Sequence, residues 1–123
     1  MAAPCDVSFT VPGDPVVKGR PRFTRYGKTY TPKKTVDAEA AIAAIAGDLV
    51  QEPFGVPVGV EVAFFCATKR RTDGDNLMKL VLDAMNEVVF VDDYLVEEVR
   101  YRVYRKVEGE TPRTEVCVYQ LED

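Results

Sequence analysis

Two kinds of hydrophobic spacing alternate along this chain of 123 residues. Apolar and polar residues alternate over 7–11, and apolar side chains recur at every second position over 58–66. This period predicts two β-strands, because successive side chains of a strand point to opposite faces. Similar runs at about 99–107 and 114–121 predict two more strands. Gly109 lies in the turn between them, so we expect these last two strands to form an antiparallel hairpin.

Two stretches with helical spacing lie between the strands. Thr31-Pro32 has the residues of an N-cap and a first helical position, and it predicts a helix that continues to about Val50. The apolar face of this helix would carry Ile42, Ile45 and Leu49. A second helix is predicted from Asp75 to about Val88. Its buried stripe would consist of Leu77, Val81, Ala84 or Met85, and Val88.

The order of these elements predicts one small α+β domain over residues 1–123. Its sheet would be mixed but mostly antiparallel, and it would have two main helices. A basic arm at about 15–36 follows the first strand. Apolar residues make up 46% of the chain and charged residues 29%, as is typical of globular proteins. No apolar run approaches the roughly 20 residues that span a bilayer, and we read no signal peptide in the first residues, so we expect no membrane contact.

The residue types that are absent limit the possible chemistry. The chain has no histidine, which excludes Ser-His-Asp and Cys-His systems and every metal site that needs an imidazole. Its three cysteines, Cys5, Cys66 and Cys117, are far apart in the sequence and form no CxxC pair. We therefore expect no disulfide framework and no structural zinc, and we expect reduced thiols in a cytoplasm.

Charge is distributed unevenly. The net charge is −4, but residues 15–36 hold seven cations and no acid, which leaves −11 for the rest of the chain. Three aromatic residues, Phe23, Tyr26 and Tyr30, lie among these cations, and a second basic cluster is formed by 69–71. Cations attract phosphates and aromatic rings stack on bases, so the pattern favours nucleic acid over an ordinary solvated loop.

Four aspartates form the candidate catalytic cluster. Asp73 and Asp75 flank Gly74 at the start of the second helix, and Asp92 and Asp93 follow that helix. Their carboxylates are hard oxygen ligands suited to Mg²⁺, with Mn²⁺ as a possible substitute. The two pairs meet only if residues 88–91 turn back along the helix. An alternative is left open, in which Asp73 or Asp75 caps the helix and Asp92-Asp93 belongs to a turn.

Known nucleotide and calcium motifs do not account for this region. An EF-hand loop that began at Asp73 would place Leu77 and Ala84 at ligand positions, and the chain has neither a P-loop nor a GxGxxG motif. Lys79 lies one turn from both Asp75 and Asp83. It is either part of a surface charge ladder or a cation near a metal-bound phosphate.

Together these residues resemble the signature of RusA-type Holliday junction resolvases. The resemblance consists of Asp73-x-Asp75-Asn76-x-x-Lys79-x-x-x-Asp83-Ala84-x-Asn86, the later Asp92-Asp93, and the upstream Lys18-Gly19-Arg20-Pro21-Arg22. It covers roughly residues 11–105. Glu87 differs from the pattern, since glycine is common there, so the second helix is expected to end somewhat differently.

The resemblance implies a homodimeric, Mg²⁺-dependent endonuclease that cuts four-way DNA junctions by paired symmetric nicks. Asp73, Asp75 and Asp93 would be the metal-binding catalytic carboxylates, Asp92 would support or replace Asp93, and Lys79 would be the catalytic lysine. The DNA-binding candidates are Lys18, Arg20, Arg22, Arg25, Lys69, Arg70, Arg71 and Asn76. Phage or prophage origin and action in the cytoplasm of a bacterial cell or phage host are also expected.

Three alternatives remain open at this point. The first is a nuclease of the same fold that acts on other branched DNA. The second is a non-catalytic protein that binds branched DNA and uses its aspartates structurally. The third is a metal-binding protein with no DNA partner. A nuclease without histidine would need a bound metal to hydrolyse a phosphodiester. The clustered aspartates can hold such a metal, which favours the nuclease interpretations.

Overall fold

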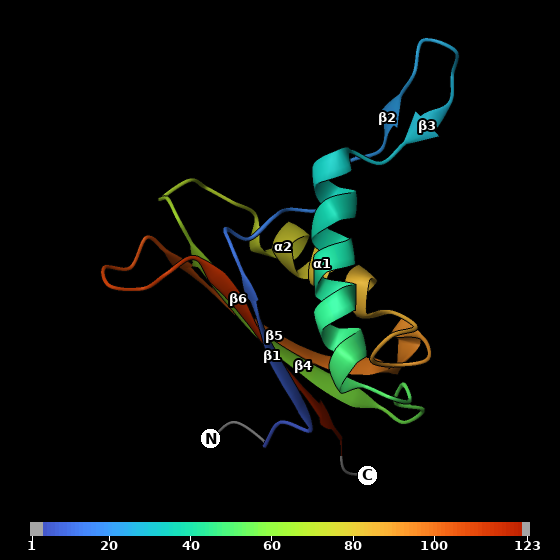
Figure 1. Ribbon diagram of the computed structural model, residues 1–123, viewed down its shortest axis with the longest axis vertical. Coiled ribbons are helices and arrows are strands. Elements are labelled where there is room, and N and C mark those ends of the chain that lie inside the picture. Colours follow the sequence, from blue (N-terminus) through green and yellow to red (C-terminus); the bar gives the residue numbers. More distant parts are fainter. Residues whose placement is uncertain (1–3, 122–123) are drawn as a thin grey trace.

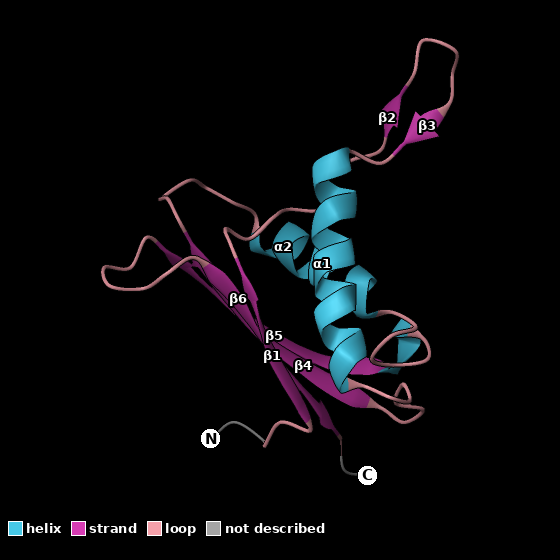
Figure 2. Ribbon diagram, viewed as in Figure 1, coloured by secondary structure: helices cyan, strands magenta, loops and turns pink. Residues whose placement is uncertain are grey.

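The structure, a computed structural model that describes residues 4–121, has two layers. Helices cover one face of a twisted sheet, and a small hairpin projects from the body (Figures 1 and 2). The strands are β1 (Val7–Pro12), β2 (Arg22–Phe23), β3 (Thr29–Tyr30), β4 (Val58–Cys66), β5 (Val96–Arg105) and β6 (Arg113–Gln120). The helices are α1 (Lys33–Leu49) and α2 (Gly74–Met85), and a short 3-10 helix covers Asp93–Leu95.

The main sheet has the strand order β1-β6-β4-β5. β6 is antiparallel to both of its neighbours, whereas β4 and β5 are parallel and α2 connects them. The predicted α+β class, with a mixed and mostly antiparallel sheet and two main helices, is therefore confirmed. The predicted hairpin of the last two strands is wrong: β5 and β6 lie on opposite sides of β4. The side-chain alternation of a strand indicates which residues share a face, but not which strands are neighbours.

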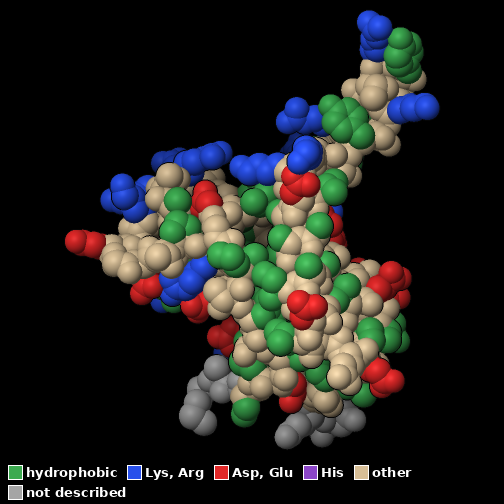
Figure 3. Space-filling model, viewed as in Figure 1, with side chains coloured by type: hydrophobic (Ala, Val, Ile, Leu, Met, Phe, Trp, Pro, Cys, Tyr) green, Lys and Arg blue, Asp and Glu red, His purple; other side chains and the backbone are tan. Residues whose placement is uncertain are grey.

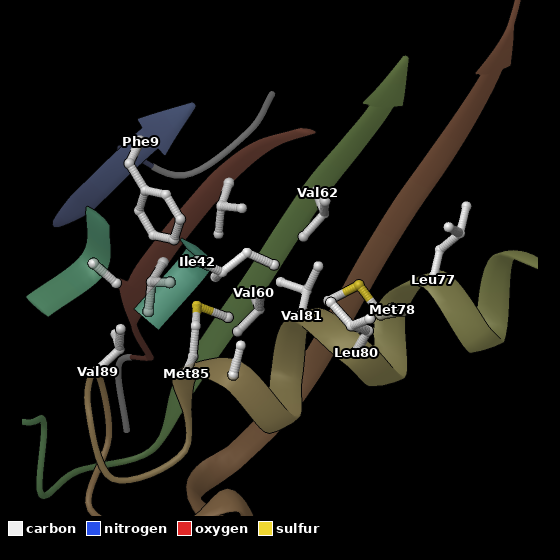
Figure 4. Packing of buried hydrophobic residues seen from close by; sticks show 14 of the residues in the cluster. Phe9, Ile42, Val60, Val62, Leu77, Met78, Leu80, Val81, Met85 and Val89 are labelled. Carbon is white, nitrogen blue, oxygen red and sulfur yellow. The ribbon is translucent and has the colours of Figure 1, made fainter. Parts of the chain in front are cut away.

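The core lies between the sheet and the two helices. Val60, Val62 and Phe64 of β4 belong to one buried cluster with Leu77 and Val81 of α2, and all five are at most 2% exposed. Figure 4 shows the same layer continuing to Phe9 of β1, Ile42 of α1 and Val89. β4 is buried almost throughout, because it is an inner strand beneath both helices. This core fixes α2 against the sheet, with the helix running antiparallel to β5.

Several local predictions need correction. Thr31 does not cap α1, whose N-cap residue is Pro32, without a side-chain hydrogen bond. Leu49 was expected on the buried face, but it is 54% exposed at the end of α1. α2 ends at Met85 rather than at about Val88, and Glu87 then adopts a φ of 67°. This left-handed conformation lets the Glu87 N–H donate to the Phe90 carbonyl oxygen at 2.8 Å, which turns the chain back.

Replacing Glu87 with glycine is expected to stabilise the fold. A left-handed conformation costs an L-residue roughly 1–2 kcal/mol, and glycine loses part of that gain to backbone entropy. The free energy of unfolding should rise by about 0.5–1 kcal/mol, measured by urea denaturation. Glu87→Ala is the control. It removes the side chain beyond the β-carbon but keeps the β-carbon itself, so the free energy of unfolding should not rise. Equal effects of both variants would show that the side chain, and not the backbone, is responsible.

The cysteine prediction is also wrong in part. Cys5 and Cys117 form a disulfide across 112 residues, and only Cys66 is free among the described cysteines. The pairing follows from the topology, because β1 lies beside β6 and Ser8 is opposite Cys117. Spacing along the chain does not reveal that proximity. The cysteines therefore give no argument for a reducing compartment.

Candidate active site and nucleic-acid interface

An acidic groove of about 360 Å³ runs between α2 and β5. Its lining consists of Asp75, Met78, Lys79, Leu82, Asp83, Asp93, Val96, Val99 and Tyr101. Because α2 is antiparallel to β5, Asp75 lies near the middle of β5, and Asp83 lies nearer to its beginning. The turn around Glu87 returns the chain so that Asp93 joins the same groove. Residues 88–91 therefore reverse the direction of the chain, which is the condition for Asp93 to return to the helix.

Asp73 and Asp75 have different surroundings. Asp73 is the N-cap of α2, and its Oδ1 accepts a hydrogen bond from the Asp75 backbone N–H at 2.9 Å. Asp75 is exposed in the groove, and its Oδ1 accepts from the Tyr101 hydroxyl at 2.8 Å. This hydrogen bond raises the pKa of Tyr101. One of the two aspartates thus has a capping function, and the other presents its carboxylate to the groove.

Tyr101 is a site residue that the sequence did not reveal. Its ring lies so close to the start of α2 that a β-carbon on Gly74 would be 2.4 Å from the Tyr101 Cε1 atom. Gly74 therefore allows the ring to pack beneath Asp75. The alternation of β5 places Tyr101 on the same face as Val99, but only the parallel pairing of β4 with β5 brings it to Asp75.

Asp92 and Asp93 form a pair of interacting carboxyl groups. A hydrogen bond with Asp92, then desolvation and the negative charges of Asp92 and Asp83, raise the pKa of Asp93. Asp93 lines the groove, whereas Asp92 does not. Like charges gathered at one place favour either a shared proton or a bound cation.

The two lysines of the signature have different partners. Lys18 donates to Glu39 and lies 3.0 Å from Asp83, and its side chain is 25% exposed. Burial lowers the pKa of Lys18, but hydrogen bonds and charges from Glu39 and Asp83 outweigh burial and raise it overall. Lys79 is exposed in the groove and forms no ion pair with a carboxylate of residues 4–121. Of the two alternatives for Lys79, the charge ladder from Asp75 to Asp83 is absent from the described residues, and Asp83 pairs with Lys18 instead.

The other cations that were predicted to bind DNA gather at one end of the molecule. Figure 3 shows Lys and Arg side chains over the projecting β2–β3 hairpin and over the loop between β4 and α2. These residues are exposed and, within the described part of the chain, are not paired with carboxylates: Arg20, Arg22, Arg25, Lys69, Arg70 and Arg71. The hairpin also exposes Phe23 (72%) and Tyr26 (78%), and Arg25 lies over the Tyr26 ring.

Asn76 ties the basic arm to the start of α2. Its backbone carbonyl accepts from the Lys18 N–H at 3.1 Å, while its side chain is exposed. The basic arm therefore leaves the body beside Asp75. None of the helices in the described range is long and apolar enough to cross a membrane.

The donor set suits a divalent cation that is held partly by a substrate. Between residues 4 and 121, no three acidic or cysteine side chains come close enough together to enclose a metal ion. Mg²⁺ commonly uses only one or two protein carboxylates together with substrate phosphates and waters. Asp75 and Asp93, which both line the acidic groove, are the carboxylates that such a site would use.

A groove lined by carboxylates beside a cationic end suits a protein that binds a polyanion. The model of the family described as endodeoxyribonuclease RusA matches residues 12–119 of this chain. The match covers most of the sequence, and the chain belongs to this endodeoxyribonuclease family. It is also similar to YqaN of Bacillus subtilis strain 168, described as an uncharacterized protein. The identity is 27% over 140 residues, and the match covers 94% of this chain and 96% of YqaN.

Proposed function

We propose that this protein resolves four-way DNA junctions by paired, symmetric nicks in a reaction that depends on Mg²⁺. The observation that carries the proposal is the acidic groove, whose lining includes Asp75, Lys79 and Asp93, beside the unpaired cations at one end of the described structure. Membership of an endodeoxyribonuclease family supports hydrolysis of DNA as the reaction.

Asp75 and Asp93 would hold the metal, and Asp73 and Asp92 would support them from either side. Bound there, Mg²⁺ or Mn²⁺ supplies a water of lowered pKa and neutralises charge on the phosphate. Lys79 has no carboxylate partner in the described structure, so its ammonium group is available to bind a phosphate oxygen. The hydrogen bond from Tyr101 engages Oδ1 of Asp75 and would keep the carboxylate in one orientation, with Oδ2 left for the metal.

The basic end would hold the arms of the junction. Arg20, Arg22 and Arg25 of the basic arm, together with 69–71, would contact phosphates, with Asn76 beside them at the start of α2. Lys18, held by Glu39 and Asp83, would act mainly by anchoring the arm. Exposed aromatic rings on the hairpin offer surfaces on which bases stack.

Paired nicks require two active sites, so the proposal includes a homodimer. A two-fold DNA junction is matched most simply by a two-fold protein. Such an enzyme would act where branched DNA forms, in the cytoplasm of a bacterial cell or phage host. Nicking of a junction labelled on each strand in turn tests this proposal. Cuts at symmetric positions in two opposite strands are expected, and cuts in one strand alone would contradict paired resolution.

A non-catalytic DNA-binding protein is the second candidate. One observation favours it: Asp73 already has a structural role as the N-cap of α2. This candidate predicts junction binding without cleavage in Mg²⁺ and in Mn²⁺. A nuclease for other branched substrates would instead cut flaps or forks faster than four-way junctions.

Replacing Tyr101 with phenylalanine is expected to weaken metal binding. The ring and its packing remain, but Asp75 loses the hydrogen bond that orients it. Loss of a partner that orients a metal ligand typically costs about 10–100-fold in affinity or activity. We expect a Mn²⁺ affinity about 10-fold lower by calorimetry, with the thermal midpoint nearly unchanged. Tyr104→Phe, on the opposite face of the sheet, is the control; equal losses in both variants would contradict a specific effect through Asp75.

A further inference from the structure

A second pocket lies near the start of α2, and Thr72, just before that helix, is part of its lining. It has a volume of about 330 Å³ and is enclosed between the basic arm and the loop that joins β4 to α2. Four cations line it: Arg20, Arg22, Lys34 and Arg70. None of them pairs with a carboxylate of the described chain. We call this cavity the arm pocket.

The walls of the arm pocket are not simply cationic. Val16, Val17, Pro21 and Pro32 contribute apolar surface. Asp14 is the one acid among the described residues that line it, and that carboxylate accepts a hydrogen bond from the Ala67 N–H at 2.8 Å. A site for phosphate alone needs no apolar wall. Cations combined with apolar surface suit a ligand that has both a negative charge and a flat apolar ring, as a nucleotide has. Arginine side chains also stack on bases.

Both sides of the arm pocket are held in place. On the arm side, the Gly19 N–H donates to the Thr35 hydroxyl at 3.0 Å, and Thr35 is only 2% exposed. On the loop side, the Arg105 guanidinium donates to the Arg70 and Thr72 carbonyls at 3.2 and 2.7 Å. These contacts connect each wall to an element of the core, so the cavity is built before a ligand arrives.

The volume of the arm pocket limits the size of its ligand, and its position limits the distance from the acidic groove. About 330 Å³ is near the lower end of the roughly 300–1,000 Å³ typical of small-molecule sites, which is too small for a duplex. Thr72 lines the arm pocket and Asp75 lines the acidic groove, so the facing edges of the two are three residues, or at most about 11 Å of chain, apart. One DNA strand has a phosphate about every 3.4 Å of duplex, so both sites lie within about three nucleotides of each other.

We propose that the arm pocket takes one unstacked nucleotide of the strand being cut, within about three nucleotides of the scissile phosphate. This inference rests on the proposed function and adds the substrate feature that the protein selects. Arg20, Arg22, Lys34 and Arg70 bind the flanking phosphates, and the proline and valine walls receive the base. Branch points suit this site because a base there is released at lower cost than one inside a duplex.

The test uses junctions with 2-aminopurine, whose fluorescence rises when the base leaves the stack. The probe is placed in turn at each of three positions on either side of the mapped cut, and the full chain is added in EDTA. Val17→Phe fills the pocket, and Val36→Phe, on an exposed part of α1 outside the pocket, is the matched control. Thermal midpoints establish that both variants fold.

We expect a fluorescence rise of several-fold at one position with the parent chain and with Val36→Phe. Val17→Phe should abolish the rise while junction affinity stays within about threefold. Tight binding with no rise at any position, or a rise that Val17→Phe leaves intact, would overturn the arm pocket alone. Failure of the parent chain to bind the junction would instead overturn the proposed function, and this inference with it.

Discussion

Replacing Asp75 with asparagine is expected to reduce junction cleavage by about 10³-fold or more, equal to roughly 4 kcal/mol of activation free energy. The amide is a poor ligand for a divalent cation, so the acidic groove would lose its main metal contact. The amide oxygen still accepts from the Tyr101 hydroxyl, so the fold should be retained. Junction affinity should be unchanged or higher, because one negative charge near the DNA is removed.

The matched control for this variant is Asp48→Asn. Asp48 is exposed on α1, distant from the acidic groove in the sequence and absent from its lining. The Asp48→Asn protein should cleave the junction at the parent rate. Single-turnover cleavage, junction affinity and thermal midpoint would be measured for both proteins. If Asp75→Asn lowered the midpoint and the affinity together, the carboxylate would have a structural role and the proposed metal site would be wrong.

Replacing both Arg20 and Arg22 with alanine is expected to produce the largest loss of DNA binding. Both are exposed and unpaired within the described chain, so each is free to neutralise a phosphate. Log affinity falls with log salt with a slope of about −0.9 for each phosphate contact, so the loss of two contacts should make the slope less negative by about 1.8. Affinity near 0.1 M salt should fall by about 10-fold or more.

Arg100→Ala is the control for the arginine pair. Arg100 lies on β5, on the sheet face opposite the helices, and its side chain is 65% exposed. It should leave both the affinity and the salt slope close to the parent values. Fluorescence anisotropy at several salt concentrations measures both quantities. An unchanged slope in the Arg20/Arg22 variant would mean that the basic arm does not contact phosphates.

Local features of this protein were predictable, whereas contacts between distant segments were not. Strand β4 was predicted at 58–66, its observed range, because every second residue is buried beneath two helices. Capping by Asp73 or Asp75 was anticipated as an alternative, and Asp73 is the residue that caps. The Cys5–Cys117 disulfide was missed because it depends on β1 lying beside β6.

The same distinction applies to the candidate site. The sequence identified Asp75, Lys79 and Asp93 as candidates, and the structure brings them to one groove. The sequence did not reveal Tyr101 as a partner of Asp75, because their contact depends on the parallel pairing of β4 and β5. Nor did it reveal that Lys18 lies between Glu39 and Asp83, since three separate segments converge there. Motifs thus indicate candidate residues, and the topology determines which of them share one groove.

The most direct test of the central claim is cleavage of a labelled four-way junction beside a linear duplex of matched sequence. Each substrate is incubated with the protein in Mg²⁺ and, separately, in EDTA. The acidic groove and the basic end together predict paired nicks in the junction in Mg²⁺, none in EDTA, and an intact duplex. Junction binding without cleavage in both Mg²⁺ and Mn²⁺ would contradict the account and leave a DNA-binding protein whose aspartates have structural roles.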